Sequence, residues 1–422
     1  MTNYYGPLTF KQGSDTSTVV DPRFGTSATP TQPSGWAVGG GGGSTYSGGV
    51  RGEGFHVPPG ALSNLTAALA NNATDQRVEI SYMGDSTGYG SGPDLAGGPP
   101  RKLRDLLLAA GLTDGGAGSM YMHGEFSITN TFSEGNKPYT WPPGGPGLMT
   151  NTIGETMTVT GTGTAIRMWG IFMDRLTYSV DGGAPVRFPS PNSATHYISG
   201  LAPGSHTIVI KNAATAPNTL CGMFVEFLNT SGVVVHQDSV SGATSTAYTS
   251  YLRSKGTGAG GNTNTQYGLG MVQGLGGGPD WRAAPAVRPQ NRNVKAAIFA
   301  LGLNDMSGIT SDATADSEGS LVATKLSENA ALFIRMCRSA QADPIIVVPH
   351  FESDSRGWRF AGRGRQALVT VAEAHGVAWC DYSTALRFAG ISEQDNPHLP
   401  QTSYDAEAQF LFDNVLSLAL PA

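Results

Sequence analysis

The chain is 422 residues long, which is too much for one ordinary domain and suits two or three. Its hydrophobic share is 39%, its charged share is 14% and its formal net charge is −6, with no dense run of Lys or Arg. This composition fits a globular protein and argues against nucleic acid and anionic membranes as partners. Three cysteines are too few for a disulfide framework, and we expect Cys337 and Cys380 to be buried free thiols.

Membrane and export signals are missing from the sequence. No apolar run reaches the roughly 18 residues of a transmembrane helix, and the N-terminus lacks the basic-then-apolar order of a signal peptide. The Gly-, Ser-, Thr- and Asn-rich composition is nevertheless typical of a protein that acts outside a cell. We therefore expect a virion component, released by lysis, or a protein exported without a signal peptide of the usual kind.

Residues 1–75 show little periodicity and include a Gly-rich stretch at 35–54. The sequence predicts an N-terminal arm or linker here. Both an attachment arm and a partly ordered tail fit the segment. Within it, only residues 60–72 have the pattern of a short helix.

From residue 77 onward the pattern changes to alternating strands and helices. Residues 78–83 are a strand candidate, and residues 101–110 have helical spacing that stops at Gly111. This alternation returns after residue 230 and predicts a parallel sheet with helices on both faces. The later strands are expected at 233–238, 294–301, 344–350 and 377–382, and the later helices at 317–342, 362–376 and 404–420.

Residues 149–229 interrupt this rhythm with short alternating runs punctuated by Gly, Pro and Asn. Asp181-Gly182-Gly183 is a hairpin-turn signal between two of the runs. Such a pattern predicts an inserted all-β sandwich domain, which we place at 121–229. The α/β domain would then comprise residues 76–120 and 230–422.

The first candidate for chemistry is Gly84-Asp85-Ser86-Thr87-Gly88, directly after a predicted strand. A serine at the carboxyl end of a parallel strand projects into the crevice where α/β sheets bind ligands. The pattern also fits G-x-S-x-G, the nucleophile elbow of the α/β-hydrolases. By itself it is equally compatible with a Gly-rich turn that has no chemistry.

The second candidate is Asp395-Asn396-Pro397-His398. A serine hydroxyl needs a base to become a nucleophile, and the base needs a carboxylate to fix its tautomer. An acid three residues before a histidine meets both needs within one loop, although a surface Asp and His have the same spacing. His350, which follows a predicted strand, is the best rival base.

Two further segments also lie at strand ends. Gly302-Leu303-Asn304-Asp305 carries an amide that can donate to an oxyanion, and the segment 239–245 contains Gly242, whose N–H is little obstructed. Ordinary turns explain each segment equally well when it is taken alone.

Together, in this order, the four segments resemble the SGNH (GDSL-like) hydrolases, which have GDS, a Gly loop, G-x-N-D and D-x-x-H blocks. The resemblance covers about 76–120 and 230–420 and implies a flavodoxin-like three-layer α/β/α fold. It also implies Ser86 as nucleophile, His398 as base, Asp395 as its orienting acid, and an oxyanion hole of the Ser86 and Gly242 N–H groups and the Asn304 amide. No metal or cofactor is implied.

The sequence departs from this family at several points. Leu399 replaces the usual proline after the histidine, His236-Gln237 stand where an Asn is common, and the gap from Ser86 to Gly242 is unusually long. These departures leave the substrate in doubt, while every catalytic group is present. The α/β-hydrolase alternative is weaker, because that fold places its nucleophile after several strands and its acid and histidine on separate loops.

The insert resembles galactose-binding-like modules found with esterases that act on glycans. A carbohydrate-binding surface with Tyr139, Trp141, Trp169 and Tyr197 as stacking groups, and a simple frame whose aromatics are core, fit equally well. We take Trp169, Tyr197 and His350 as candidate substrate-binding residues.

The resulting hypothesis is an esterase that removes O-acyl groups, above all O-acetyl groups, from a surface polysaccharide or cell-envelope component. A phage tail-associated enzyme would explain both the composition and the missing signal peptide. We expect it to be a trimer if it is attached through residues 1–60. The alternatives are a catalytically inactive receptor-binding or structural virion protein and a lipase-like esterase on long acyl chains.

Overall fold

The protein, in this computed structural model, consists of two compact units, Met1–Gly41 and Gly42–Ala422. The described part of the first unit is an antiparallel hairpin of β1 (Leu8–Gln12) and β2 (Asp15–Val19). The second unit contains everything else. The structure describes residues 8–12, 15–19, 49–71, 77–88, 90, 98–118, 127–130, 148–150, 152–171, 173–188, 194–215, 221–239, 243–246, 292–306, 315–350, 358–391 and 398–421.

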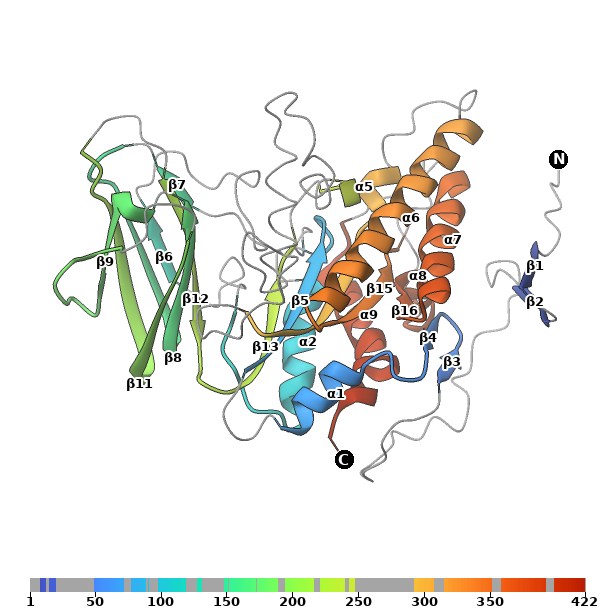
Figure 1. Cartoon of the computed structure of the whole chain (residues 1–422), viewed down its shortest axis with the longest axis horizontal. Helices are drawn as coiled ribbons and strands as arrows, with labels where there is room; N and C mark the ends of the chain where they lie inside the picture. The colour runs from blue at the N-terminus through green and yellow to red at the C-terminus, as the bar shows by residue number, and fades with distance from the viewer. Residues whose placement is uncertain are drawn as a thin grey trace. The chain divides into compact units, whose positions relative to one another are not determined.

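The centre of the second unit is a seven-stranded sheet whose first five strands are parallel (Figure 1). In space the strands follow the order β13 (Gly232–Gln237), β5 (Arg77–Gly84), β14 (Val294–Ala300), β15 (Asp343–Val348), β16 (Ala378–Asp381), β4 (Phe55–Val57) and β3 (Val50–Gly52). Counted along the chain, the five parallel strands have the order 2-1-3-4-5, which is the flavodoxin-like arrangement. The predicted α/β fold class is confirmed.

Helices cover both faces of this sheet and complete three layers (Figure 1). The alternation of side chains along each strand explains why both faces are apolar. Ile346 and Val348 of β15 pack with α6 (Ala315–Ser339) and α7 (Trp358–His375). Ile345 and Val347 face the opposite layer, made of α1 (Ser63–Ala70), α2 (Gly98–Ala109) and α9 (Gln401–Asn414). The second unit also contains the short helices α5 (Leu303–Met306) and α8 (Tyr382–Phe388) and the 3-10 turns η3 (Met173–Arg175) and η4 (Leu416–Ala419).

Residues 50–70 belong to the α/β fold, which differs from the predicted arm at 1–75. β4 pairs antiparallel with β16, with Phe55 opposite Cys380, and β3 continues the sheet beyond β4. The side chains here are at most 4% exposed and belong to the same hydrophobic core as the apolar residues of α9; they are Phe55, Val57, Leu65 and Leu69. Two three-residue strands carry too short a pattern to be recognised from sequence alone.

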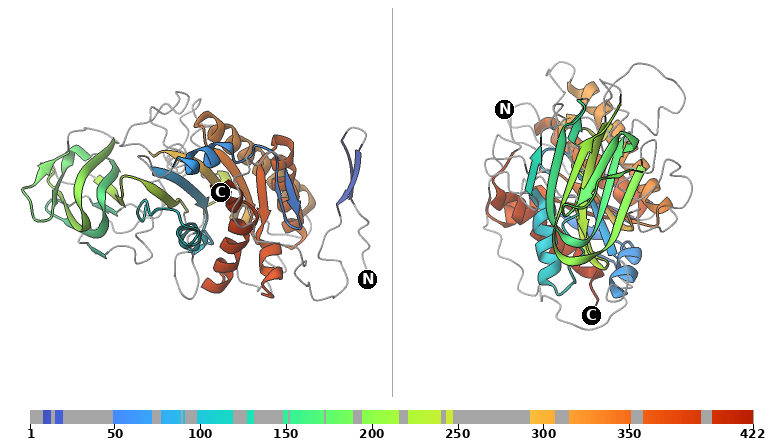
Figure 2. Two further views of the ribbon diagram at one scale, coloured as in Figure 1. Left: turned by 90° about the horizontal axis from the view of Figure 1, so that it is seen from below. Right: turned by 90° about the vertical axis from the view of Figure 1, so that its left-hand side faces the viewer.

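A second sheet, all antiparallel, lies on the β13 side of the parallel sheet (Figures 1 and 2). Its strands run from Ser127 to Leu228, within the interval expected for the insert, and their described parts form one continuous hydrogen-bonded sheet. The strands are β6 (Ser127–Asn130), β7 (Leu148–Thr150), β8 (Thr156–Ile171), β9 (Leu176–Val180), β10 (Val186–Arg187), β11 (Ala194–Asn212) and β12 (Cys221–Leu228).

The predicted hairpin turn joins β9 to β10. Asp181 and Gly182 both have positive φ, 51° and 74°, and the Gly183 N–H donates to the Val180 carbonyl at 2.9 Å. These are the features of a type I′ turn, which favours Asp-Gly because both central residues adopt left-handed conformations.

Cys337 and Cys380 are buried free thiols, as expected from their apolar surroundings. In the part of the chain that the structure describes, no helix combines the length and apolar character needed to cross a membrane.

Candidate active site

Ser86 lies in a tight turn directly after β5, whose eight residues are all buried. Glycines permit this turn to lie close to Ser239, which follows β13. A Cβ at Gly88 would lie 2.5 Å from Ser239 Oγ, and a Cβ at Gly84 would lie 2.9 Å from the same atom. Both glycines thus leave room for the Ser239 side chain, and the turn holds Ser86 at the carboxyl edge of the sheet.

His398 reaches Ser86 across 312 positions of sequence, with its Nε2 2.8 Å from Ser86 Oγ. It lies just before α9, where buried Leu399 donates its N–H to the Tyr404 hydroxyl at 3.2 Å. Burial, helped by the charge of His350, lowers the pKa of His398 below its ordinary value. The imidazole is consequently neutral near pH 7 and able to accept a proton from the hydroxyl.

Asp85 is a fully buried carboxyl beside the nucleophile. Its Oδ1 accepts hydrogen bonds from the Thr87 N–H and the Thr87 hydroxyl, both at 2.9 Å. Its Oδ2 has no hydrogen-bond partner among the described residues. Because burial outweighs the two donors, the pKa of Asp85 is raised to about 6. Asp85 thus fixes the turn through Thr87 and remains incompletely compensated.

Asn304 and Asp305 lie at the end of the adjacent strand, since Ala300 of β14 is opposite Gly84 of β5. The Asn304 amide donates to the Ala243 carbonyl at 3.1 Å. Asp305 accepts from the Ser245 N–H at 2.8 Å and from the Ser245 hydroxyl at 2.6 Å, and burial raises its pKa. These bonds join the segment 302–305 to the segment 239–245 at the same edge as Ser86.

Three predicted site residues lie wholly or partly outside the described residues. They are Asp395, Gly242 and the side chain of Trp169, whose backbone pairs within β8. Tyr139 and Trp141, expected as stacking groups, lie outside as well. Their roles stay predictions.

His350 and Tyr197 make internal contacts, which differs from the substrate surface expected for them. His350 is 2% exposed, and its Nδ1 lies 2.5 Å from Oε1 of the equally buried Glu407 of α9. The Tyr197 hydroxyl accepts from Arg77 Nη1 at 2.9 Å, at the junction of the two sheets. The histidine in hydrogen-bond contact with Ser86 is His398.

Sequence reasoning missed Glu407 and the charged residues inside the strands. A signal existed for the second group, because Glu79, Arg167 and Glu226 each stand between two apolar neighbours in sequence. Charged side chains are almost never fully buried unless they are paired. Among the described residues, no group of three or more His, Cys, Asp and Glu side chains is arranged to hold a metal ion.

The fold has a counterpart among solved structures. A peptidoglycan O-acetylesterase superposes with a TM-score of 0.56 at 15% identity, over 84% of this chain and 96% of its own. A carbohydrate esterase family 2 enzyme with a carbohydrate-binding domain, from Corynascus thermopiles (Myceliophthora fergusii), gives 0.29 at 12% identity, over 69% of this chain and 99% of its own. A family two carbohydrate esterase from Clostridium thermocellum gives 0.27 at 13% identity, over the same shares.

These likenesses differ in what they establish. The first shows that this chain shares the fold of the peptidoglycan O-acetylesterase; at their TM-scores the other two carry no argument. No family model and no curated protein matches the sequence.

Proposed function

We propose that this protein is a serine ester hydrolase with Ser86 as its nucleophile and His398 as its general base. One observation carries the proposal: Ser86 Oγ and His398 Nε2 are 2.8 Å apart at the carboxyl edge of a parallel sheet. A hydroxyl and a neutral imidazole in hydrogen-bond contact are the reacting pair of nucleophilic acyl transfer. The fold shared with a peptidoglycan O-acetylesterase supports the same reaction class.

The proposed reaction proceeds in two stages. Ser86 Oγ attacks the ester carbonyl carbon while His398 Nε2 accepts the hydroxyl proton, and the imidazolium then gives that proton to the leaving alcohol. Water then attacks the acyl carbon while His398 Nε2 accepts its proton, the bond from that carbon to Ser86 Oγ breaks, the acid leaves, and the imidazolium returns the proton to Ser86 Oγ. In this proposal Asp395 orients His398, and the oxyanion is bound by the Ser86 and Gly242 N–H groups and the Asn304 amide. None of these steps requires a cofactor.

The proposed substrate is an O-acetyl ester of a surface polysaccharide or cell-envelope component. The similarity to a peptidoglycan O-acetylesterase motivates this choice, together with an all-β insert beside the catalytic fold. The composition further motivates a role at the virion surface, as part of a phage tail, with a trimer as the assembly to test. A lipase-like esterase for long acyl chains and an inactive receptor-binding protein are the competing proposals.

Hydrolysis of p-nitrophenyl esters tests the proposal. We expect the wild type to hydrolyse the acetyl ester and Ser86→Ala to lose at least about 10⁴-fold in kcat. Ser339→Ala, at an exposed serine of α6, is the matched control and should keep full activity. Equal inertness of wild type and Ser86→Ala on all acyl lengths would establish the binding-protein alternative.

The substrate class is tested with the same protein. A series from acetyl to palmitoyl esters should show the highest kcat/KM at acetyl, and acetate should be released from O-acetylated peptidoglycan or polysaccharide. A maximum at long chains would identify a lipase-like enzyme instead.

A further inference from the structure

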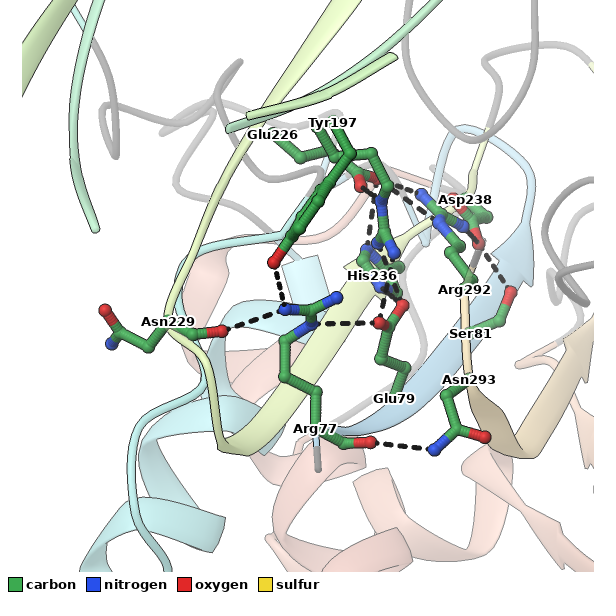
Figure 3. A network of polar contacts seen from close by, with 11 residues as sticks. Arg77, Glu79, Ser81, Tyr197, Glu226, Asn229, His236, Asp238, Arg292 and Asn293 are labelled. Carbon is green, nitrogen blue, oxygen red and sulfur yellow. Dashed lines mark hydrogen bonds and ion pairs between the residues drawn. The ribbon is translucent and has the colours of Figure 1, made fainter. Parts of the chain in front are cut away.

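A buried network of charged side chains joins the insert to the catalytic fold (Figure 3). The insert contributes a guanidinium and a carboxylate, and the strands and strand ends of the parallel sheet contribute the rest. The charged members are Arg167 of β8 and Glu226 of β12 on one side, and Arg77, Glu79, His236, Asp238 and Arg292 on the other. All are at most 9% exposed, so each charge depends on its partners and not on water.

The charges in this network compensate one another. Burial by itself would raise the pKa of Glu226, but Arg167 and Arg292 lower it to about 2. Burial acts in the same way on Glu79, whose pKa is nevertheless held well below its ordinary value by Arg167, His236 and Arg77. Both carboxyls are therefore ionised at any physiological pH, and the contacts are permanent ion pairs.

Arg292 links the insert to the segment that follows β13. Its Nη2 donates to Glu226 Oε1 at 2.5 Å and its Nε donates to the same oxygen at 3.2 Å. Its Nη1 donates to Asp238 Oδ2 at 2.6 Å, and that oxygen also accepts the Ser81 hydroxyl at 2.5 Å. The guanidinium that fixes Asp238 is thus itself fixed by a carboxylate of the insert.

The residues on either side of Asp238 frame the turn that carries Ser86. Gln237 Nε2 donates to the Gly88 carbonyl at 3.2 Å. Ser239 is fully buried, and its Oγ fills the space where a Cβ of Gly84 or Gly88 would stand. A displacement of Asp238 would therefore shift the residues that contact both ends of the Gly84–Gly88 turn.

A second connection runs through β5, the strand that ends at this turn. Arg167 Nη1 and Nη2 donate to the two oxygens of Glu79 at 3.1 and 2.9 Å, in bidentate geometry. Arg167 Nε donates to Glu226 Oε2 at 2.5 Å. The insert therefore holds both the strand before Ser86 and the segment packed beside it.

From these contacts we infer that Glu226 and Arg167 are positioning residues, through which the insert holds the nucleophile turn in register with His398. This inference rests on the proposed esterase function. A buried ion network permits one arrangement, because any shift in register leaves a charge without its partner. Small displacements of a reacting group are costly, since about 1 Å of misplacement can reduce turnover about 100-fold.

The test is Glu226→Gln assayed on p-nitrophenyl acetate, well below the melting temperature. This small ester has no glycan to engage the insert, so any effect on its hydrolysis acts through the active site. Active sites are counted by stoichiometric phosphorylation with diethyl p-nitrophenyl phosphate. We expect kcat per titrated site to fall about 10- to 100-fold with KM changed less than about threefold.

Asp343→Asn is the matched control. Asp343 is also a buried carboxyl, bonded to Asn64 and the Leu65 N–H at 2.8 Å, but it begins β15 at the opposite edge of the sheet from Ser86. It should leave kcat per titrated site unchanged.

A purely structural role for the network would reduce the number of titrated sites and leave the turnover of each unchanged, which would overturn the inference. If Glu226→Gln does not fold, Arg292→Lys decides, because lysine keeps the charge but lacks the fork that spans Glu226 and Asp238. Wild-type kcat per site in that variant would also overturn the inference. Inactivity of the wild type itself would instead refute the proposed function.

Discussion

Two buried carboxyls on the same chain segment, Glu79 and Asp85, are held in opposite electrostatic states. Both are 0% exposed. Glu79 is surrounded by guanidinium groups, and its pKa lies well below the ordinary value. Among the described residues, Asp85 accepts hydrogen bonds from the two donors of Thr87, and burial raises its pKa to about 6. The segment 79–85 thus runs from a compensated charge at the insert to an incompletely compensated one beside Ser86.

The contrast separates a cluster that holds elements in position from the site of the proposed chemistry. Compensated buried ion pairs fix the relative position of the elements they join. Groups with strongly shifted pKa values are concentrated at active sites, where the loss of stability that they cause is offset by their role in the reaction. The same comparison predicts that mutations at the two carboxyls will change the free energy of unfolding by different amounts and with different pH dependence.

The largest effect on stability is expected at Glu79. Glu79→Gln leaves Arg167 facing one anion fewer at a site where both side chains are 0% exposed, and we expect the free energy of unfolding to fall by about 3–5 kcal/mol. Urea unfolding measures this. Glu53→Gln, at a half-exposed carboxylate paired with Arg387, is the control and should cost less than about 1 kcal/mol. Equal losses of unfolding free energy in Glu79→Gln and Glu53→Gln would show that the buried pairs of Glu79 contribute no more than an exposed ion pair.

A smaller and pH-dependent effect is expected at Asp85. Its folded pKa is above the ordinary 3.8, so its stabilising contribution is complete below about pH 4 and is lost as the pH rises through about 6. The shift of about two units corresponds to about 3 kcal/mol. Asp85→Asn should therefore gain about that much relative to the wild type between pH 4 and pH 7.5.

The measurement is the free energy of unfolding of both proteins across this pH range. Asp343, whose pKa burial also raises to about 6, is present in both and cancels in the difference. A difference independent of pH would mean that Asp85 is not the uncompensated carboxyl inferred from its contacts.

Much of the architecture follows from local patterns in the sequence. Apolar runs such as 344–350 and 294–301 predicted buried parallel strands, and the turn at Asp181-Gly182 predicted a hairpin. Ser86 and His398 were assigned from the order of four segments that together resemble one hydrolase family, and the structure brings the two side chains into contact. The strands and the hairpin were predicted from short segments alone, whereas the nucleophile and the base required the four segments together.

The remaining features depend on which distant segments meet. Glu226 and Arg292 each read as an isolated charge in sequence, and only folding shows that one carboxylate serves two guanidiniums. Tyr197 was interpreted as a sugar-stacking group, but its partner Arg77 lies 120 positions away. The strands at 50–57 were missed because their stability comes from pairing with β16 and not from their own pattern.

The most direct test of the account is the rate at which diethyl p-nitrophenyl phosphate modifies the protein, with the modified residue identified by mass spectrometry. We expect modification of Ser86 alone, at a rate that rises with pH through a pKa below 6.5, since burial lowers the pKa of His398. In His398→Gln the rate should fall at least about 100-fold. Modification of another residue, or an unchanged rate in His398→Gln, would contradict the assignment of this pair as the catalytic centre.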